Sequence, residues 1–178
     1  MKPFFCVASG LLLSLSVATA AEPLTPQVTR GRELFLHSPK GTACGTCHSM
    51  GGLGTAVGPN LTTLASSVGP RGLVMTFKMT VYAYAKDYKL AGGGTFPGIE
   101  KQKVGDAIEI WDLGQKPPEL RKMASKDIVS VKQTQLWKHP PAGAGYTSQE
   151  FADVVGFLKW AATGSVKEIK PSDVEAAQ

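Results

Sequence analysis

Two cysteines and a histidine stand close together at Cys44, Cys47 and His48, in the order Cys-Gly-Thr-Cys-His. Two thiols at this spacing can each form a thioether with one of the two vinyl groups on an edge of a haem. The imidazole directly after the second thiol can then bind the haem iron as its proximal ligand. The spacing therefore predicts covalent attachment of one c-type haem.

The Cys-x-x-Cys spacing also occurs in thioredoxin-like redox pairs and in zinc sites. A thioredoxin-like pair belongs to a βαβ unit, and no βαβ pattern precedes Cys44. A zinc site needs a second pair of Cys or His at matching spacing, which this sequence lacks. Haem attachment is therefore the interpretation that fits these residues best.

The first twenty residues have the composition of a secretory signal peptide. Lys2 gives a positive start, residues 4–17 are apolar apart from small Ser and Gly, and residues 18–20 (Ala-Thr-Ala) resemble a cleavage site. The apolar run is short for a membrane span, although an uncleaved anchor is the alternative. We expect residues 1–20 to be removed on export to the periplasm or beyond. Cys6 would leave with them, so that Cys44 and Cys47 would be the only cysteines of the mature chain.

The composition fits one globular domain and excludes several classes of function. The chain has 178 residues, of which 43% are hydrophobic and 19% charged, with a formal net charge of +5. This mild positive charge includes no run of Lys or Arg that could follow a phosphate backbone, so nucleic acid is not an expected partner. Three cysteines are too few for a disulfide-based scaffold.

Short motifs flank the cysteines on both sides. Residues 31–35 are Gly-Arg-Glu-Leu-Phe, and residues 58–61 are Gly-Pro-Asn-Leu. With these flanks the sequence resembles the class I cytochrome c family, whose members carry a GxxLF segment on the first helix and a GPxL segment after the haem site. The resemblance implies that the Pro59 carbonyl accepts a hydrogen bond from the proximal imidazole of His48.

A helix is predicted to begin at Ser148. Residues 147–150 (Thr-Ser-Gln-Glu) have the form of a capping box, in which the Thr and Glu side chains satisfy the free backbone N–H groups of the first turn. Apolar residues then recur at helical spacing along one face: Phe151, Val154, Val155 and Leu158. The resemblance to the class I cytochrome c family implies that this is the C-terminal helix, which in that family crosses the first helix.

The chain is longer than a minimal cytochrome domain, and the surplus lies between Leu61 and Ser148. Alternating apolar and polar residues or short apolar runs predict three strands there: Phe77–Ala85, Ala107–Leu113 and Ile128–Val131. We expect a mainly α fold, a cytochrome c-like helical domain over residues 21–165, with a small antiparallel β-sheet inserted at about residues 74–132. The charged residues 166–178 are expected to form a flexible tail.

This order of motifs, over roughly residues 30–163, resembles a branch of bacterial haem-binding domains with a β-hairpin segment after the GPxL motif. In that branch, the Met of a Met-Pro pair shortly before the C-terminal helix is the sixth iron ligand. The corresponding residues here are His139 and Pro140. The resemblance thus implies two axial histidines, His48 and His139. Two imidazoles favour ferric iron relative to a His/Met pair, which predicts a low reduction potential.

Other residues could occupy the sixth position. Met123, in a Lys-rich stretch expected to be a loop or short helix, is the main alternative, and an open or water-bound site is another. Met50 follows His48 too closely to reach the opposite side of a haem. Met75 and Met79 are expected in the core beside the first predicted strand.

A six-coordinate covalent haem has no vacant site for a substrate, so the expected function is transfer of single electrons rather than catalysis. The expected partners are a dehydrogenase, a membrane complex or a terminal acceptor. One alternative is a haem-based gas sensor or peroxidase-like enzyme with a displaceable distal ligand. Another is a cytochrome subunit docked on a periplasmic dehydrogenase through the exposed face of the sheet, including Tyr82 and Tyr84.

Overall fold

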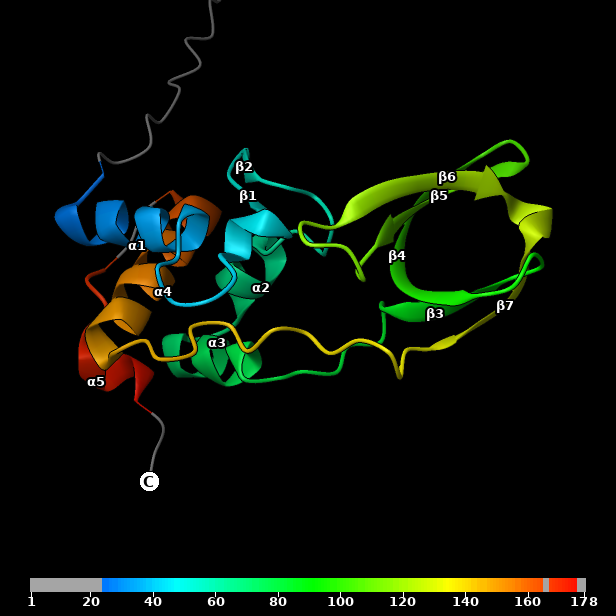
Figure 1. Cartoon of the computed structure of the whole chain (residues 1–178). Coiled ribbons are helices and arrows are strands. Elements are labelled where there is room, and N and C mark those ends of the chain that lie inside the picture. Colours follow the sequence, from blue (N-terminus) through cyan, green and yellow to red (C-terminus); the bar gives the residue numbers. More distant parts are fainter. Residues whose placement is uncertain (1–23, 165–166, 176–178) are drawn as a thin grey trace, which may run out of the picture.

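The fold is a mixed α/β structure made of a helical body and a β-sheet body (Figure 1). The computed structural model describes residues 24–164 and 167–175, so the predicted signal peptide lies outside the described residues. Helices account for 34% and strands for 25% of them. The prediction of a mainly α fold was therefore wrong, because the sheet has five strands and a hydrophobic core of its own.

The helical body is formed by both ends of the described chain. Its elements are the helices α1 (Pro26–Leu36), α2 (Thr62–Ser67), α3 (Pro70–Phe77), α4 (Ser148–Thr163) and α5 (Pro171–Val174), the 3₁₀ turn η1 (Cys44–Thr46) and the short strands β1 (Ser49–Met50) and β2 (Leu53–Gly54). Strands β1 and β2 form a small hairpin directly after the two cysteines. The sequence between α3 and α4 forms the sheet and its two connecting segments.

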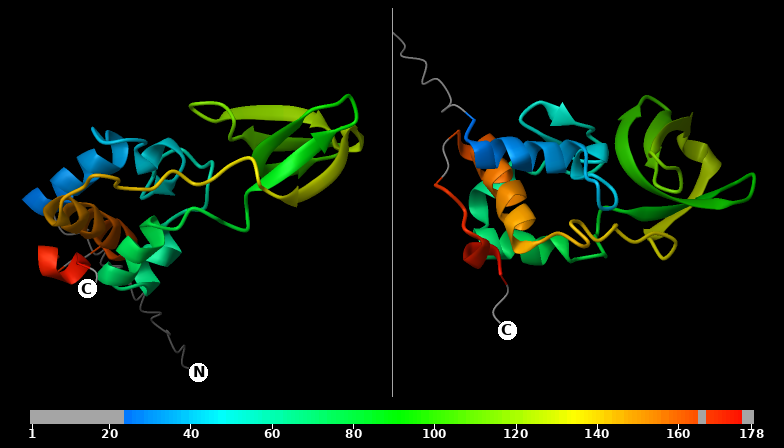
Figure 2. Two further views of the ribbon diagram at one scale, coloured as in Figure 1. Left: turned by 60° about the horizontal axis from the view of Figure 1, so that its bottom comes forward. Right: turned by 60° about the vertical axis from the view of Figure 1, so that its left-hand side comes forward.

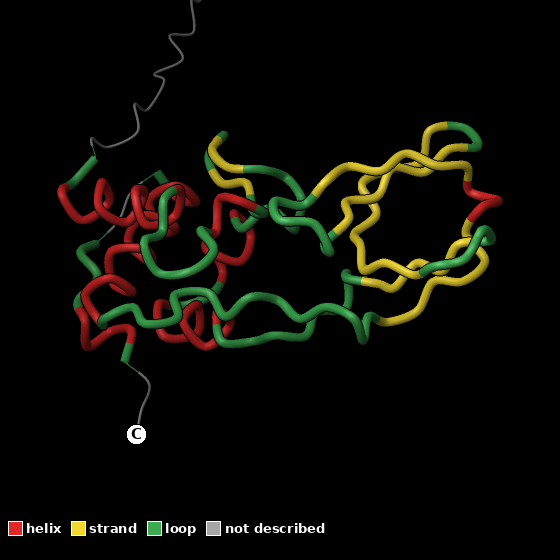
Figure 3. Tube along the Cα trace, viewed as in Figure 1, coloured by secondary structure: helices red, strands yellow, loops and turns green. Residues whose placement is uncertain are grey.

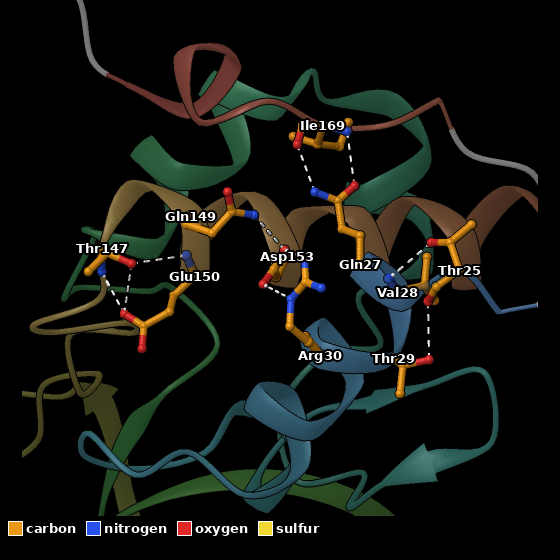
Figure 4. A network of polar contacts seen from close by, with 10 residues as sticks. All are labelled: Thr25, Gln27, Val28, Thr29, Arg30, Thr147, Gln149, Glu150, Asp153 and Ile169. Carbon is orange, nitrogen blue, oxygen red and sulfur yellow. Dashed lines mark hydrogen bonds and ion pairs between the residues drawn. The ribbon is translucent and has the colours of Figure 1, made fainter.

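Helices α1 and α4 cross in close contact at Gly31. A Cβ atom on Gly31 would lie 1.9 Å from the backbone oxygen of Asp153, so only glycine allows the two backbones to approach this closely. Beside the crossing, Arg30 donates two hydrogen bonds to the Asp153 carboxylate at 2.7 and 2.9 Å (Figure 4). On the other side, the rings of Phe35 and Phe157 pack with centroids 5.3 Å apart. This crossing joins the two ends of the chain.

The predicted start of the C-terminal helix is confirmed. Thr147 is the N-cap of α4, its hydroxyl accepts a hydrogen bond from the Glu150 backbone N–H, and the Glu150 carboxylate accepts one from the Thr147 N–H (Figure 4). The helix ends at Gly164, which has a positive φ of 75°. Local sequence thus sets both ends of α4.

The sheet is an antiparallel meander whose last strand returns to the first. Its strands are β3 (Lys86–Leu90), β4 (Thr95–Val104), β5 (Ala107–Asp112), β6 (Glu119–Ala124) and β7 (Ile128–Gln133), with the 3₁₀ turn η2 (Ser125–Asp127) before β7. The strand order is β6-β5-β4-β3-β7, and the sheet curls strongly on itself (Figure 3). The residues buried most deeply inside the curl are Tyr88, Phe96, Ile108 and Ile110.

Two of the three predicted strands are confirmed, as β5 and β7. The predicted strand Phe77–Ala85 was wrong, because Phe77 ends α3 and residues 78–85 form no strand. The sheet therefore occupies residues 86–133 rather than beginning near residue 74. Strands β3, β4 and β6 of this sheet were not predicted.

Residues 167–175, part of the stretch predicted to be a flexible tail, make specific contacts with the helical body, and residues 166 and 176–178 of that stretch lie outside the described residues. Within residues 167–175, Ile169 is held to α1 by a pair of hydrogen bonds with the Gln27 side chain, at 2.7 and 3.0 Å (Figure 4). Val174 on α5 is buried in a cluster with α3 and α4. Apolar side chains at these positions pack this segment on the helical body.

Two connecting segments, residues 78–85 and 134–147, run beside each other between the helical body and the sheet (Figures 1 and 2). They are tied together where the His139 backbone N–H donates a hydrogen bond to the Thr80 carbonyl at 2.9 Å. Among the residues described, no helix combines the length and hydrophobicity needed to cross a membrane.

Candidate functional site

A cavity of about 300 Å³ lies between the helical body and the sheet. Its size is in the range of small-molecule and cofactor sites, roughly 300–1,000 Å³, and most of its wall is apolar. Five residues singled out from the sequence all line it: Cys44, Cys47, His48, Pro59 and His139. The fold thus brings together residues that are up to 95 positions apart in the chain.

The 3₁₀ turn η1 presents both cysteines to the cavity. The backbone N–H groups of Cys47 and His48 both donate to the Cys44 carbonyl, at 3.1 and 2.9 Å, which closes the turn. Both thiols are free, and burial raises the pKa of Cys44 to about 11 and also raises that of Cys47. At neutral pH the thiols are therefore protonated, unlike the low-pKa nucleophilic thiol of a thioredoxin-like pair.

The His48 imidazole is oriented by Pro59. Its Nδ1 lies 2.8 Å from the Pro59 carbonyl oxygen, which can only accept, so Nδ1 carries the proton and donates. Burial lowers the pKa of His48, and the bond to Pro59 opposes that shift in part. The ring is thus held neutral with Nε2 left for another partner, as in histidine ligands of metals.

Gly58 leaves room for this imidazole, because a Cβ atom on it would lie 2.8 Å from His48 Cε1. We expect Gly58→Ala to displace the ring and to lower the free energy of unfolding by about 1–3 kcal/mol, measured by urea denaturation. Gly92→Ala is the control, since its Cβ would meet nothing within 4 Å. Equal free energies of unfolding for the two variants would show that the His48 ring does not pack closely against Gly58.

His139 faces His48 across the cavity. The two ring centroids are 5.9 Å apart, with the ring planes tilted by 44°. Burial and then the neighbouring His48 lower the pKa of His139. Its buried Nδ1 makes no hydrogen bond of good geometry within the described residues, although the Pro140 backbone raises the pKa of His139 against burial. A buried polar atom without a good partner is unfavourable, so this nitrogen is available to a group that protein atoms do not supply.

The spacing of the two rings fits two axial ligands of one metal ion. A metal–nitrogen bond of about 2 Å on each side, plus about 1 Å from nitrogen to ring centroid, places the centroids about 6 Å apart. The observed 5.9 Å agrees with this value. The adjacent thiols and the apolar wall fit the remainder of a covalently attached haem.

No methionine among the described residues lines the cavity. Met123 lies on β6 opposite Ile108 and packs against the core of the sheet, so it fills space there instead of offering a ligand. Met50 is fully buried in the helical body. Met75 and Met79 are 53% and 50% exposed, contrary to the prediction that they belong to the core.

Three aromatic residues complete the wall around His139, and sequence reasoning did not find them. Tyr82 and Tyr84 stack with ring centroids 5.2 Å apart. The centroids of the Tyr82 and Trp137 rings lie 5.1 and 5.9 Å from that of the His139 imidazole, in T-shaped arrangements. Tyr82 donates a hydrogen bond to the Thr76 carbonyl at 2.9 Å. The two tyrosines therefore line the cavity, whereas the sequence had placed them on an exposed face. The alternation of residues 77–85 predicted an extended backbone, but it could not predict that the two tyrosine side chains pack against the cavity.

Comparison with models of known protein families gave no match, and comparison with curated protein sequences gave none. Within residues 24–164 and 167–175, no three or more His, Cys, Asp or Glu side chains are grouped to hold a bare metal ion. The site is thus defined by its geometry alone: two thiols, two facing imidazoles and an apolar cavity.

Proposed function

We propose that this protein is an exported c-type cytochrome with one covalently attached haem and two axial histidines, which transfers single electrons between redox partners. The observation that carries this proposal is the pair of imidazoles, 5.9 Å apart, that face each other across an apolar cavity beside two free thiols. The sequence of residues 1–20 supports export.

Each residue of the site has a defined part in this proposal. Cys44 and Cys47 would hold the haem through thioethers, and His48 and His139 would bind the iron. Haem bound there supplies a centre that gains and loses one electron. The Pro59 carbonyl oxygen lies 2.8 Å from Nδ1 of His48 and accepts its hydrogen bond. This keeps the imidazole in the tautomer in which Nε2 carries no proton. Most of the cavity wall is apolar, and burial there lowers the pKa of His139, which favours its neutral imidazole.

The test is the absorption and low-temperature EPR spectrum of the ferric holoprotein, together with the rate at which the ferrous protein binds carbon monoxide. We expect a low-spin spectrum without the weak far-red thioether band and slow binding of carbon monoxide. His139→Ala removes one ligand, so we expect a high-spin ferric signal and binding of carbon monoxide faster by on the order of 100-fold.

Met123→Ala is the matched control, because it alters a side chain in the sheet core and away from the cavity. It should leave spectrum and binding rate unchanged. A high-spin signal in the unaltered protein would contradict a closed site and would favour a haem sensor or a peroxidase-like enzyme. A thioether band in the unaltered protein would contradict two axial histidines.

A further inference from the structure

The segment that carries His139 is anchored to strand β3 by Asp87. The Asp87 carboxylate accepts one hydrogen bond from the Thr134 hydroxyl at 2.5 Å and another from the Gln135 backbone N–H at 2.8 Å. Thr134 is only 7% exposed, so water competes little for its hydroxyl. Hydrogen bonds to a charged group are about twice as strong as those between neutral groups. The start of the segment is thereby fixed to the sheet.

The contacts continue from Thr134 to His139. The Thr134 hydroxyl, which donates to Asp87, also accepts from the Trp137 backbone N–H at 3.1 Å. The Trp137 ring then meets the His139 imidazole edge-on, with ring centroids 5.9 Å apart and planes at 83°. Each contact thus constrains the next, from the carboxylate on β3 to the imidazole in the cavity.

Polar contacts restrain the imidazole itself only weakly. Its Nδ1 makes no hydrogen bond of good geometry within the described residues, although the neighbouring Pro140 backbone raises the pKa of His139 against the effect of burial. The backbone N–H of His139 donates to the Thr80 carbonyl. The direction of the ring therefore depends on the backbone of its segment and on the packing of Trp137 and Tyr82. Whatever holds that backbone also sets the position of the ring.

We propose that Asp87 and Thr134 are positioning residues that hold the His139 imidazole in the cavity, so that the sheet sets the coordination of the distal side. The inference rests on the proposed function, since the held imidazole is there an axial ligand. It assigns a role to the sheet, which contributes Asp87 from a strand 52 residues before His139 in the chain.

The test compares variants of the holoprotein by the rate of carbon monoxide binding to ferrous haem, which reports how often the sixth ligand is detached. Thr134→Val keeps the shape of the side chain but removes the hydroxyl that bridges Asp87 and Trp137. We expect its rate to rise about tenfold, the change in an equilibrium expected when such a hydrogen bond is lost. Asp87→Asn, which loses the charge and retains one acceptor, should give a smaller rise.

Two matched variants separate positioning from general loss of packing. Thr134→Ser retains the hydroxyl and should bind carbon monoxide at the unaltered rate. Thr95→Val makes the same chemical change at an exposed position of the sheet and should also have no effect. Unaltered rates in both Thr134→Val and Asp87→Asn would overturn the positioning role. Rapid binding by the unaltered protein would instead overturn the proposed function.

Discussion

Replacing His139 with methionine should raise the midpoint potential of the holoprotein by on the order of 100 mV, because a thioether favours ferrous iron more than an imidazole does. For a one-electron couple this shift changes the ratio of reduced to oxidised protein by about 50-fold. The methionine side chain has a similar reach into the same apolar cavity. Potentiometric titration followed by absorption measures the shift, and the far-red thioether band shows that sulfur is bound.

The comparison for this prediction is Met123→Leu, which changes a methionine packed in the core of the sheet. Its potential should equal that of the unaltered protein. If His139→Met leaves the potential unchanged and gives no thioether band, the residue at position 139 is not an axial ligand. The facing imidazoles would then need another explanation.

Gly31→Ala should destabilise the protein by about 3 kcal/mol or more, because the added Cβ would lie 1.9 Å from the Asp153 backbone oxygen. The added Cβ is fixed directly to the backbone of α1 and the oxygen belongs to the backbone of α4, so the overlap is relieved only if α1 and α4 move apart. Moving them apart would loosen the Phe35–Phe157 contact and the Arg30–Asp153 ion pair. We expect the thermal midpoint to fall by roughly 10 °C, measured by circular dichroism.

Gly92→Ala is the comparison for the helix crossing, since a Cβ at this turn would meet nothing within 4 Å. Its thermal midpoint should stay within about 2 °C of the unaltered protein. A Gly31→Ala midpoint as high as that of Gly92→Ala would mean that the helices do not approach each other so closely.

The cysteines and the first histidine of the site were predictable from sequence because their signals are short in range, whereas the aromatic wall around His139 was not. Cys44, Cys47 and His48 lie within five residues, and the Thr147–Glu150 capping box fixed the start of α4 in advance. His139, in a segment without regular structure, was suggested only by the resemblance, at the position that the family gives to its distal ligand before the C-terminal helix. All of these side chains except those of the capping box line the cavity.

The sheet was harder to predict, because some strands form through pairing with adjacent strands and not because their own sequence favours a strand. Strand β4 contains Pro97 and a polar run from Glu100 to Lys103, which no alternation of apolar residues marks as a strand. It forms because β3 and β5 pair with it on both sides. Residues 78–85 show the opposite case, since their alternation had no neighbouring strand and they became a wall of the cavity.

The crossing of α1 and α4 has a consequence for the order of folding. The ion pair at this crossing joins residues 123 positions apart, whereas the β3–β4, β4–β5 and β5–β6 pairs join neighbours in sequence. Formation of the sheet would shorten the effective chain between the two helices by less than half. Loop-closure entropy changes by only about 0.6 kcal/mol for a twofold change in length, so early sheet formation would speed the meeting of the helices very little. Because the consecutive strands pair locally and the helix crossing gains little from them, we expect the sheet to form first and the pairing of α1 with α4 to limit the rate of folding.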